Sequence, residues 1–307
     1  MPEPAVRFDR VTKRFGSFVA VNDLSFEVPS GDIFGLLGPN GAGKTTSIRM
    51  LMNIFAPDAG RVEVLGQSMN EAVKPRLGYL PEERGLYKKM RLGELFLFFG
   101  RITGRDAAFL GPRIAAWSER MGIAEWLSHR VEDLSKGMAQ KAQFIATVLH
   151  EPSLVVLDEP FAGLDPVHRD VLRDAVLDLR RNGTTVVFST HVMEQAETLC
   201  DRILLVHRGQ ARLSGTVSEV RRREGGDAAF VRLAAAPPRG FSGLPGVTSI
   251  NDNGLEAELV LEGGADTNAL LRALSERGTV LGFDVRAPSL HEIFKRTVGA
   301  AEAGVPS

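Results

Sequence analysis

The sequence predicts an α/β protein in two parts: a core built on a largely parallel β-sheet with a helical insertion, followed by a small α+β domain. Three observations lead to this prediction. Short apolar runs alternate with helical patterns along most of the chain, the strand pattern stops between residues 84 and 150, and the composition changes after about residue 225. The length of 307 residues fits two domains of roughly 150 residues each. We therefore expect domains at residues 1–225 and 226–307.

Four apolar runs have the length and the branched side chains of buried strands. They lie at residues 33–37, 154–157, 185–188 and 203–206. Each is followed by a turn and a helical pattern, which favours parallel pairing. Between residues 84 and 150, Leu, Phe, Ile and Trp recur at helical spacing, so we expect a helical subdomain there.

The C-terminal part combines short strands with two helices. Pro and Gly accumulate between residues 237 and 246 and form a predicted loop. Ser289 stands three residues before Glu292, which is the pattern of a capping box at the start of a closing helix. The other elements that we expect are strands at 229–233, 247–251, 255–261 and 279–285 and a helix at 267–277.

The composition limits the classes of function. Lys and Arg number 37 and Asp and Glu 38, a net charge of −1. This balance gives no reason to expect nucleic acid or an anionic membrane as a partner. The single cysteine excludes an intrachain disulfide. No apolar stretch approaches the ~20 residues of a spanning helix, so we expect any step in a membrane to belong to a separate protein.

Residues 38–45 match the pattern G-x-x-x-x-G-K-[ST] and are called the Walker A loop below. The loop follows the strand at 33–37 and opens a helical pattern at 46–54. Its glycines let backbone N–H groups converge on phosphate oxygens, while Lys44 reaches the β and γ phosphates and Thr45 holds Mg²⁺. The nucleotide-binding residues that it predicts are Gly38, Pro39, Asn40, Gly41, Ala42, Gly43, Lys44, Thr45 and Thr46.

The strand at 154–157 is followed by two carboxylates, Asp158 and Glu159. Asp158 fits the Mg²⁺-holding partner of such a loop. Glu159 could orient and deprotonate water, or it could cap the turn before Pro160. His191 follows the strand at 185–188, at the strand ends where ligands of α/β proteins lie. It could donate a hydrogen bond to the γ phosphate, or it could be an ordinary surface histidine.

Residues 134–138 open a helical pattern at 139–149. Ser135 suits an N-cap, and Lys136 and Gly137 in the first turn would make a second anion-binding helix end. We call residues 135–137 the signature turn. Taken alone, the pattern is also that of an ordinary capped helix.

In their order along the chain, six segments resemble the motifs of the ATP-binding subunits of ABC transporters. They are the Walker A loop (38–45), the Q-loop (79–82), the signature (134–138), Walker B (157–159), the D-loop (163–165) and the switch histidine, His191. The resemblance covers about residues 6–215. The remainder is similar to the short C-terminal domain of bacterial exporter ATPases of the sodium- and drug-efflux type, most closely at residues 288–294.

This resemblance implies a P-loop NTPase core with an antiparallel β subdomain, working as a homodimer with two ATP molecules at the interface. Ser135, Lys136 and Gly137 of one copy would face the γ phosphate held by Lys44 of the other. Phe15 would stack on adenine, although a core aromatic is the alternative. Asp165 would lie at the dimer seam. These roles come from the family and not from the spacing of the residues.

Two positions depart from the family pattern. The signature reads Ser135-Lys136-Gly137-Met138, where the common form has a second glycine and a glutamine. The serine hydroxyl and the Gly137 backbone remain, so the expected contacts survive. The Q-loop holds Glu82 where glutamine is usual. A carboxylate can coordinate Mg²⁺ or its water, so the expected metal ligands are Thr45, Asp158 and Glu82.

The expected function is that of an ATP-binding and ATP-hydrolysing transporter subunit that uses ATP and Mg²⁺. ATP would close the dimer, hydrolysis would reopen it, and a separate permease would move the cargo. The chain would then be held at the cytoplasmic face of the inner membrane through that permease. The resemblance favours export, with Na⁺ or a lipophilic drug as cargo.

Two alternatives compete with this expectation. A soluble ABC protein acting on ribosomes or DNA usually carries a second cassette or a long coiled coil, and no sustained heptads separate Lys44 from Asp158. We therefore expect no nucleic-acid partner. A nucleotide sensor without hydrolysis would lack Glu159 or His191, and both are present.

Overall fold

The computed structural model describes residues 3–83, 85–225 and 228–303. It divides into two compact units, Met1–Ser214 and Gly215–Ser307. The expected boundary after residue 225 lies one helix further along the chain. The expected boundary followed the composition, which becomes rich in Pro and Gly only after helix α7 (Val217–Gly225). By its contacts, however, α7 belongs to the second unit.

The first unit is built on a six-stranded sheet in the order β5-β6-β7-β3-β8-β9. The strand pairs β5–β6, β6–β7, β7–β3 and β3–β8 are all parallel, so the largely parallel sheet is confirmed. Every residue of β3, β6 and β7 is buried, which explains their unbroken apolar runs. The strands are β3 Ile33–Leu37, β5 Leu77–Leu80, β6 Leu154–Asp158, β7 Thr185–Thr190, β8 Arg202–His207 and β9 Gln210–Thr216.

Crossover helices connect the parallel strands of this sheet. Helices α1 (Lys44–Leu51), α5 (Pro166–Arg181) and α6 (Met193–Leu199) follow β3, β6 and β7. The expectation of a helix directly after the fourth strand is wrong, because β8 turns into β9. Arg208 and Gly209 both have positive φ (50° and 75°), as a two-residue hairpin turn requires.

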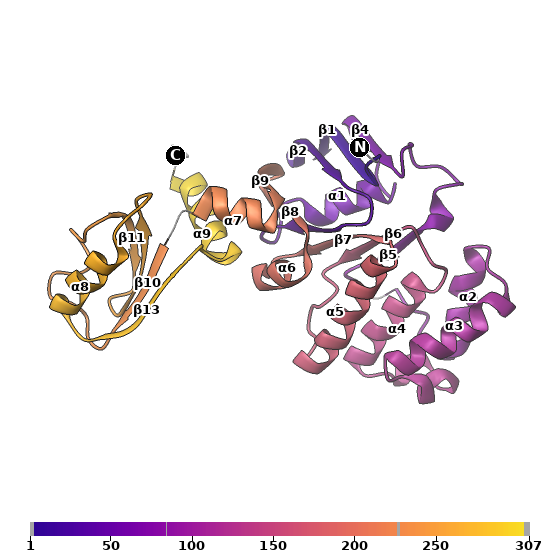
Figure 1. The fold of residues 1–307 in the computed structure, drawn as a ribbon. Helices are drawn as coiled ribbons and strands as arrows, with labels where there is room; N and C mark the ends of the chain where they lie inside the picture. The colour runs from indigo at the N-terminus through magenta and orange to yellow at the C-terminus, as the bar shows by residue number, and fades with distance from the viewer. Residues whose placement is uncertain (1–2, 84, 226–227, 304–307) are drawn as a thin grey trace. The chain divides into compact units, whose positions relative to one another are not determined.

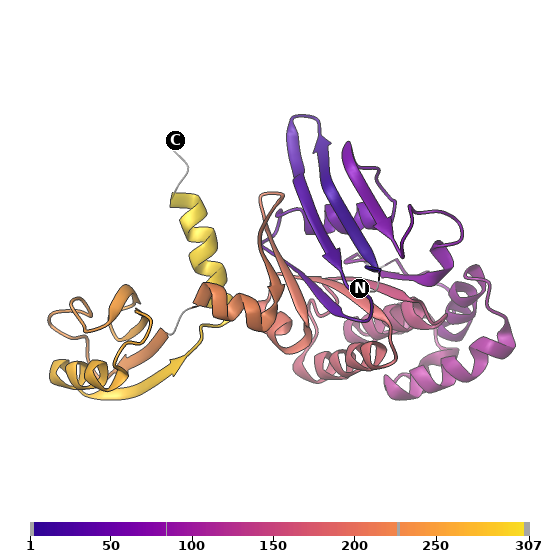
Figure 2. The ribbon, with the colours of Figure 1, turned by 45° about the horizontal axis from the view of Figure 1, so that its top comes forward.

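A three-stranded antiparallel sheet covers one side of the central sheet. Its order is β2-β1-β4, from Phe18–Val28, Val6–Phe15 and Ala59–Val64. Apolar residues of both sheets and of α1 form one buried cluster, in which Phe8 and Val156 take part. In Figures 1 and 2, this sheet and α1 lie on one side of the central sheet, and α4 and α5 lie on the other. The antiparallel β subdomain is thereby confirmed.

Between β5 and β6 the chain is helical, as expected, with α2 (Leu92–Ile102), α3 (Ala107–Arg120) and α4 (Lys136–Val148). Helix α4 begins three residues before the expected start at 139. The Ser135 hydroxyl accepts a hydrogen bond from the Met138 N–H and caps the helix there.

The second unit has a four-stranded antiparallel sheet in the order β11-β12-β10-β13. Helix α8 covers one face through a buried cluster that includes Val231, Leu259 and Leu270. The capping box is confirmed, because Glu292 accepts from the Ser289 N–H and the Ser289 hydroxyl accepts from the Glu292 N–H. The elements are β10 Ala228–Leu233, β11 Val247–Asp252, β12 Glu256–Leu261, α8 Thr267–Arg277, β13 Val280–Arg286 and α9 Leu290–Ala303.

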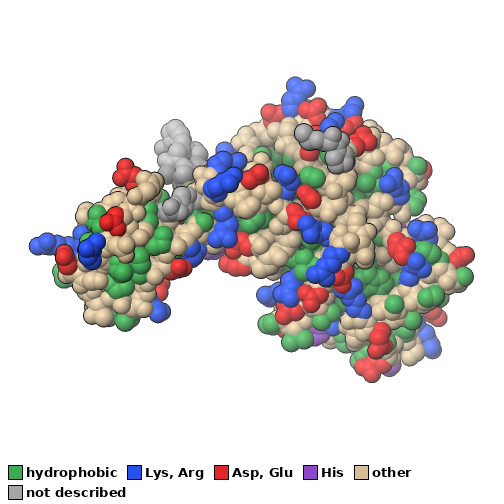
Figure 3. Space-filling model, viewed as in Figure 1, with side chains coloured by type: hydrophobic (Ala, Val, Ile, Leu, Met, Phe, Trp, Pro, Cys, Tyr) green, Lys and Arg blue, Asp and Glu red, His purple; other side chains and the backbone are tan. Residues whose placement is uncertain are grey.

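No helix within the described residues is both long and apolar enough to cross a membrane. On the face drawn in Figure 3, basic and acidic side chains are interspersed, in keeping with the balanced net charge.

Candidate nucleotide site

The candidate site lies at the carboxyl ends of three neighbouring strands, β6, β7 and β3 (Figure 1). Lys44 follows the loop after β3, Asp158 ends β6, and His191 follows β7. The parallel register sets Asp158 beside Ser189 and Leu37 beside Thr190. The structure therefore brings together residues that lie up to about 150 positions apart in the sequence, at the edge of the sheet where α/β proteins bind ligands.

The Walker A loop can follow its path only with glycine at two positions. Gly38 has φ +152°, and a Cβ there would collide with the Val206 carbonyl oxygen. Gly43 has φ +105°, and its Cβ would lie 2.6 Å from the Ala20 carbonyl oxygen. These contacts with β8 and β2 hold the loop close to the sheet.

Helix α1 leaves its first turn open for an anion. Its N-cap is Gly43, which has no side chain to accept from the first N–H groups. Lys44, Thr45 and Thr46 form this first turn. The free N–H groups and the positive end of the helix dipole together favour a phosphate at this position.

Lys44 is folded back onto the loop. Its side chain is 6% exposed and donates to the carbonyl oxygens of Gly38 (2.7 Å) and Pro39 (3.1 Å). Burial lowers the pKa of Lys44, and the carboxylates of Glu159, Asp158 and Glu82 oppose that shift. The ammonium group is thus desolvated and surrounded by acceptors, which are the conditions under which an added phosphate would attract it strongly.

Asp158 offers a free carboxylate oxygen beside a hydroxyl. Its Oδ1 accepts from Ser189 Oγ (2.5 Å) and Thr45 Oγ1 (3.4 Å). Its Oδ2 is buried and has no hydrogen-bond partner within the described part of the chain. A hard cation such as Mg²⁺ binds oxygen ligands of this kind and takes its remaining ligands from water and phosphate. No three His, Cys, Asp or Glu side chains cluster as a metal site among the described residues.

Glu159 is held in an uncommon backbone conformation, with φ +49°. Its N–H donates to Ser189 Oγ (3.1 Å), and its Oε1 lies 2.8 Å from His191 Nδ1 and 3.8 Å from Lys44 Nζ. The Glu159 side chain is 10% exposed, whereas the His191 side chain is 50% exposed. The strained turn thus directs a nearly buried carboxylate toward the loop, between a lysine and a histidine.

The sequence analysis missed Ser189. This buried serine near the end of β7 contacts both the Asp158 carboxylate and the Glu159 N–H. A polar residue directly before Thr190 and His191, in an otherwise apolar strand, was the signal that could have indicated it.

Ser189→Ala is expected to lower the free energy of unfolding of the first unit by about 1–3 kcal/mol, because the buried Asp158 carboxylate loses its shortest donor. Hydrolysis is expected to fall as well, since Glu159 loses its backbone contact. Both tryptophans, Trp117 and Trp126, lie in the first unit, so urea titration followed by their fluorescence isolates its transition. Exposed Ser249→Ala is the control, and a Ser189→Ala value equal to that control would contradict the assigned contacts.

Two other residues that the sequence analysis expects at the site, Glu82 and Phe15, lie on the exposed surface. Glu82 is exposed in the bend after β5, and its charge raises the pKa of Lys44, opposing the effect of burial. Phe15 ends β1 with 45% of its surface exposed and meets Phe55 edge-on, at 5.6 Å between ring centroids. An exposed ring of this kind remains free to stack on a planar base on its open side.

The signature turn lies at the start of α4, and the D-loop ends at the N-cap of α5. Ser135 and Lys136 are exposed at the start of α4, and Gly137 is half-buried. Asp165 is the N-cap of α5 and accepts from the His168 N–H (3.0 Å). Hydrogen bonds from His168, first the backbone and then the side chain, lower the pKa of Asp165.

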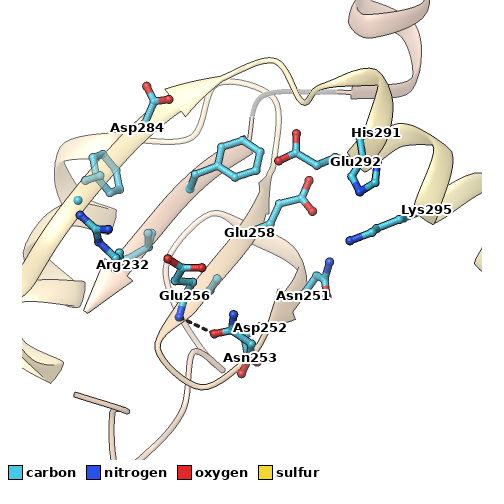
Figure 4. A pocket seen from close by; sticks show the side chains of 15 residues that line it. Arg232, Asn251, Asp252, Asn253, Glu256, Glu258, Asp284, His291, Glu292 and Lys295 are labelled. Atoms are coloured by element: carbon cyan, nitrogen blue, oxygen red, sulfur yellow. Dashed lines mark hydrogen bonds between the residues drawn. The ribbon is translucent and has the colours of Figure 1, made fainter. Parts of the chain in front are cut away.

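A separate cavity of about 610 Å³ lies in the second unit, on the sheet face beside α9. Figure 4 shows Glu258 and Glu292 directed into it, with Lys295 beside them. Glu258 forms an ion pair with Arg296 of α9, and Glu292 accepts from Arg286 of β13 (3.2 Å). These carboxylates therefore hold α9 on the sheet.

The fold and the site together define a P-loop nucleoside triphosphatase. Comparison with known families specifies the class further. Residues 21–162 match the family described as ABC transporter, and residues 215–298 match the family described as "ATP-binding protein DrrA1-3-like, C-terminal domain".

Curated relatives extend along almost the whole chain. An uncharacterized ABC transporter ATP-binding protein, YhaQ of Bacillus subtilis, is 36% identical over 95% of this chain and 98% of its own. The daunorubicin resistance ATP-binding protein DrrA3 of Streptomyces coeruleorubidus is 35% identical over 97% of each chain. A solved structure of an ATP-binding subunit of an ABC transporter matches with a TM-score of 0.68 and 28% identity, over 71% of this chain and 92% of that one.

The chain belongs to the family of ATP-binding subunits of ABC transporters. Members of this family bind ATP and hydrolyse it to power transport through a partner permease. The expected family, fold class and general function are thereby confirmed.

Proposed function

We propose that two copies of this chain close on two Mg–ATP molecules and drive export through a separate membrane permease. The observation that carries this proposal is the convergence of Lys44, Thr45, Asp158, Glu159 and His191 at the ends of three adjacent strands. The chain would be bound at the cytoplasmic face of the membrane through the permease.

The nucleotide would lie along the Walker A loop. The N–H groups of the first turn of α1 would hold its phosphates, and Lys44 would turn from the Gly38 and Pro39 carbonyls to the β and γ phosphates. Thr45 and Asp158 would hold Mg²⁺, and Glu82 would reach the ion or its water. The ion would neutralise charge on the phosphate oxygens.

Glu159 would act as the general base. Its carboxylate would take a proton from the water that attacks the γ phosphorus, while the bond to the leaving oxygen of ADP breaks. His191 would orient this carboxylate through the 2.8 Å contact and donate to the γ phosphate. The signature turn of the second copy would complete the site, with Asp165 at the seam and Phe15 against the base.

A second surface suits the permease. A mainly apolar cavity of about 230 Å³ lies between β5 and the helical insertion and is lined by Tyr79, Phe99, Ile102 and Gln143, among others. Ile102 is also exposed to solvent, as are Tyr87 and Phe98, whose rings pack against Phe99. A short amphipathic helix of the permease would fit such a surface.

The cargo that we propose is a drug. Two relatives that align with 95–97% of this chain are named for resistance, one to daunorubicin and one to linearmycin. This proposal is tested by expressing the chain with candidate permeases and measuring co-purification, ATPase stimulation and drug efflux. Efflux that is absent with every permease that co-purifies would contradict it.

Ile102→Asp tests the permease surface. Ile102 is 65% exposed, so the substitution is expected to leave the fold and the ATPase rate of the isolated chain unchanged. It is expected to reduce permease co-purification and stimulation at least about tenfold, since a charge would be buried at an apolar contact. Leu255→Asp, in the exposed part of the second unit, is the matched control. Normal stimulation of the Ile102→Asp chain would exclude this surface.

A further inference from the structure

Within one chain, the signature turn contacts the D-loop at one point and the first turn of α5 at another. Lys136 extends over Gly163, where an added Cβ would lie 2.9 Å from the lysine Cε. The imidazole of His168 lies over Gly137, where an added Cβ would be 3.4 Å from both His168 Cγ and Cδ2. The two segments that the proposed function places at the dimer face are thus in direct contact.

His168 connects both segments. Its N–H donates to Asp165 Oδ1 (3.0 Å), and its ring Nδ1 contacts Asp165 Oδ2. Both carboxylate oxygens are therefore held by one residue, whose ring also packs against the signature turn at Gly137. Asp165 cannot turn away from this position without breaking two contacts.

Helix stability alone does not account for this residue. The N-cap needs only an N–H donor from the third helical position, which any residue except proline supplies. Pro166 at the first position already favours the start of the helix. The side-chain contacts of His168 are thus additional to those that the cap requires.

We infer that His168 is a positioning residue: it locks Asp165 of the D-loop and Gly137 of the signature turn into one rigid element at the dimer face. This inference rests on the proposed dimer. When the signature turn of one copy closes on the γ phosphate of the other, Asp165 is carried into the seam by the same movement. His168 thereby links closure at one nucleotide to the geometry of the second.

Three substitutions separate the two contacts. His168→Ala removes both, His168→Asn keeps a donor near the position of Nδ1, and His168→Phe keeps a ring over Gly137. Each is measured for ATPase kcat and KM and, in a Glu159→Gln background, for ATP-induced dimerisation. His291→Ala, an exposed histidine of the second unit, is the control.

His168→Ala is expected to lower kcat by about 10- to 100-fold, because a small displacement of positioning groups has effects of this size. It is also expected to weaken the ATP-bound dimer at least about tenfold, with binding of ATP to the monomer and the melting temperature little changed. His168→Asn and His168→Phe are expected to restore part of the dimer affinity.

Wild-type kcat and dimerisation in His168→Ala would overturn the inference. A loss of melting temperature alone, or an equal loss in all three variants, would reduce His168 to a structural residue and overturn it too. If Glu159→Gln itself forms no ATP-dependent dimer, the proposed function fails, and that result is distinguishable because it requires no change at His168.

Discussion

Replacement of Lys44 by alanine is expected to abolish tight ATP binding. The ammonium group is buried at the base of the Walker A loop, and its polar contacts among the described residues are with two loop carbonyls and the Glu159 carboxylate, so it is available to two phosphates. Each charge-assisted hydrogen bond is worth about 1.5–3 kcal/mol, so losing two should weaken binding more than about 100-fold. Isothermal titration with ATP and Mg²⁺ measures this loss directly.

The control for this substitution is Lys74→Ala. Lys74 is exposed and forms its ion pair with Glu71, so its loss should leave ATP affinity unchanged. Circular dichroism establishes that the Lys44→Ala chain is folded. Wild-type affinity in that folded variant would remove Lys44 from phosphate binding and with it the main support for the site.

Replacement of Glu159 by glutamine is expected to separate binding from hydrolysis. The amide keeps the size of the side chain and can still contact His191, but it cannot accept a proton from water. Phosphate release should fall by about 10²- to 10⁴-fold. ATP affinity should be retained or increased, because a negative charge near the γ phosphate is removed.

This variant should accumulate as an ATP-bound dimer, which light scattering coupled to gel filtration detects. Glu262→Gln, on the exposed surface of the second unit, should show normal turnover and no trapped dimer. Unchanged turnover in Glu159→Gln would mean that another group activates the water. In that case the carboxylate would serve only the turn before Pro160.

Much of the geometry of the candidate nucleotide site could be predicted from sequence because the motifs that form it are local. The Walker A loop combines a fixed spacing of glycine and lysine with a buried strand before it, and both features are visible within about fifteen residues. The two carboxylates at the end of β6, Asp158 and Glu159, are indicated in the same way. Their convergence also followed, since parallel strands end at the same edge of a sheet.

The contacts that were missed depend on distant or side-chain geometry. The sequence analysis ends this strand at residue 188, and only the register of the longer strand β7 against β6 sets Ser189 beside Asp158. His168 reads as a surface position of α5, and only the packing of α5 against α4 brings its ring onto Gly137.

The β8–β9 hairpin was mispredicted for a different reason. Residues 210–216 have one buried side chain, Leu213, so the alternation that indicates a strand is weak. The chain reverses here because Arg208 and Gly209 both have positive φ, and of these two residues only the glycine indicates such a turn in the sequence. The same turn fixes the Walker A loop, since the Gly209 N–H donates to the Ala42 carbonyl (2.9 Å).

A crystal structure of the Glu159→Gln protein with Mg–ATP tests the central claim most directly. The account predicts two chains related by a twofold axis, with each γ phosphate held between Lys44 of one chain and the Ser135 hydroxyl and Gly137 N–H of the other. The account would be contradicted if ATP were bound by a single chain with Ser135 facing solvent, provided that the unsubstituted protein hydrolyses ATP.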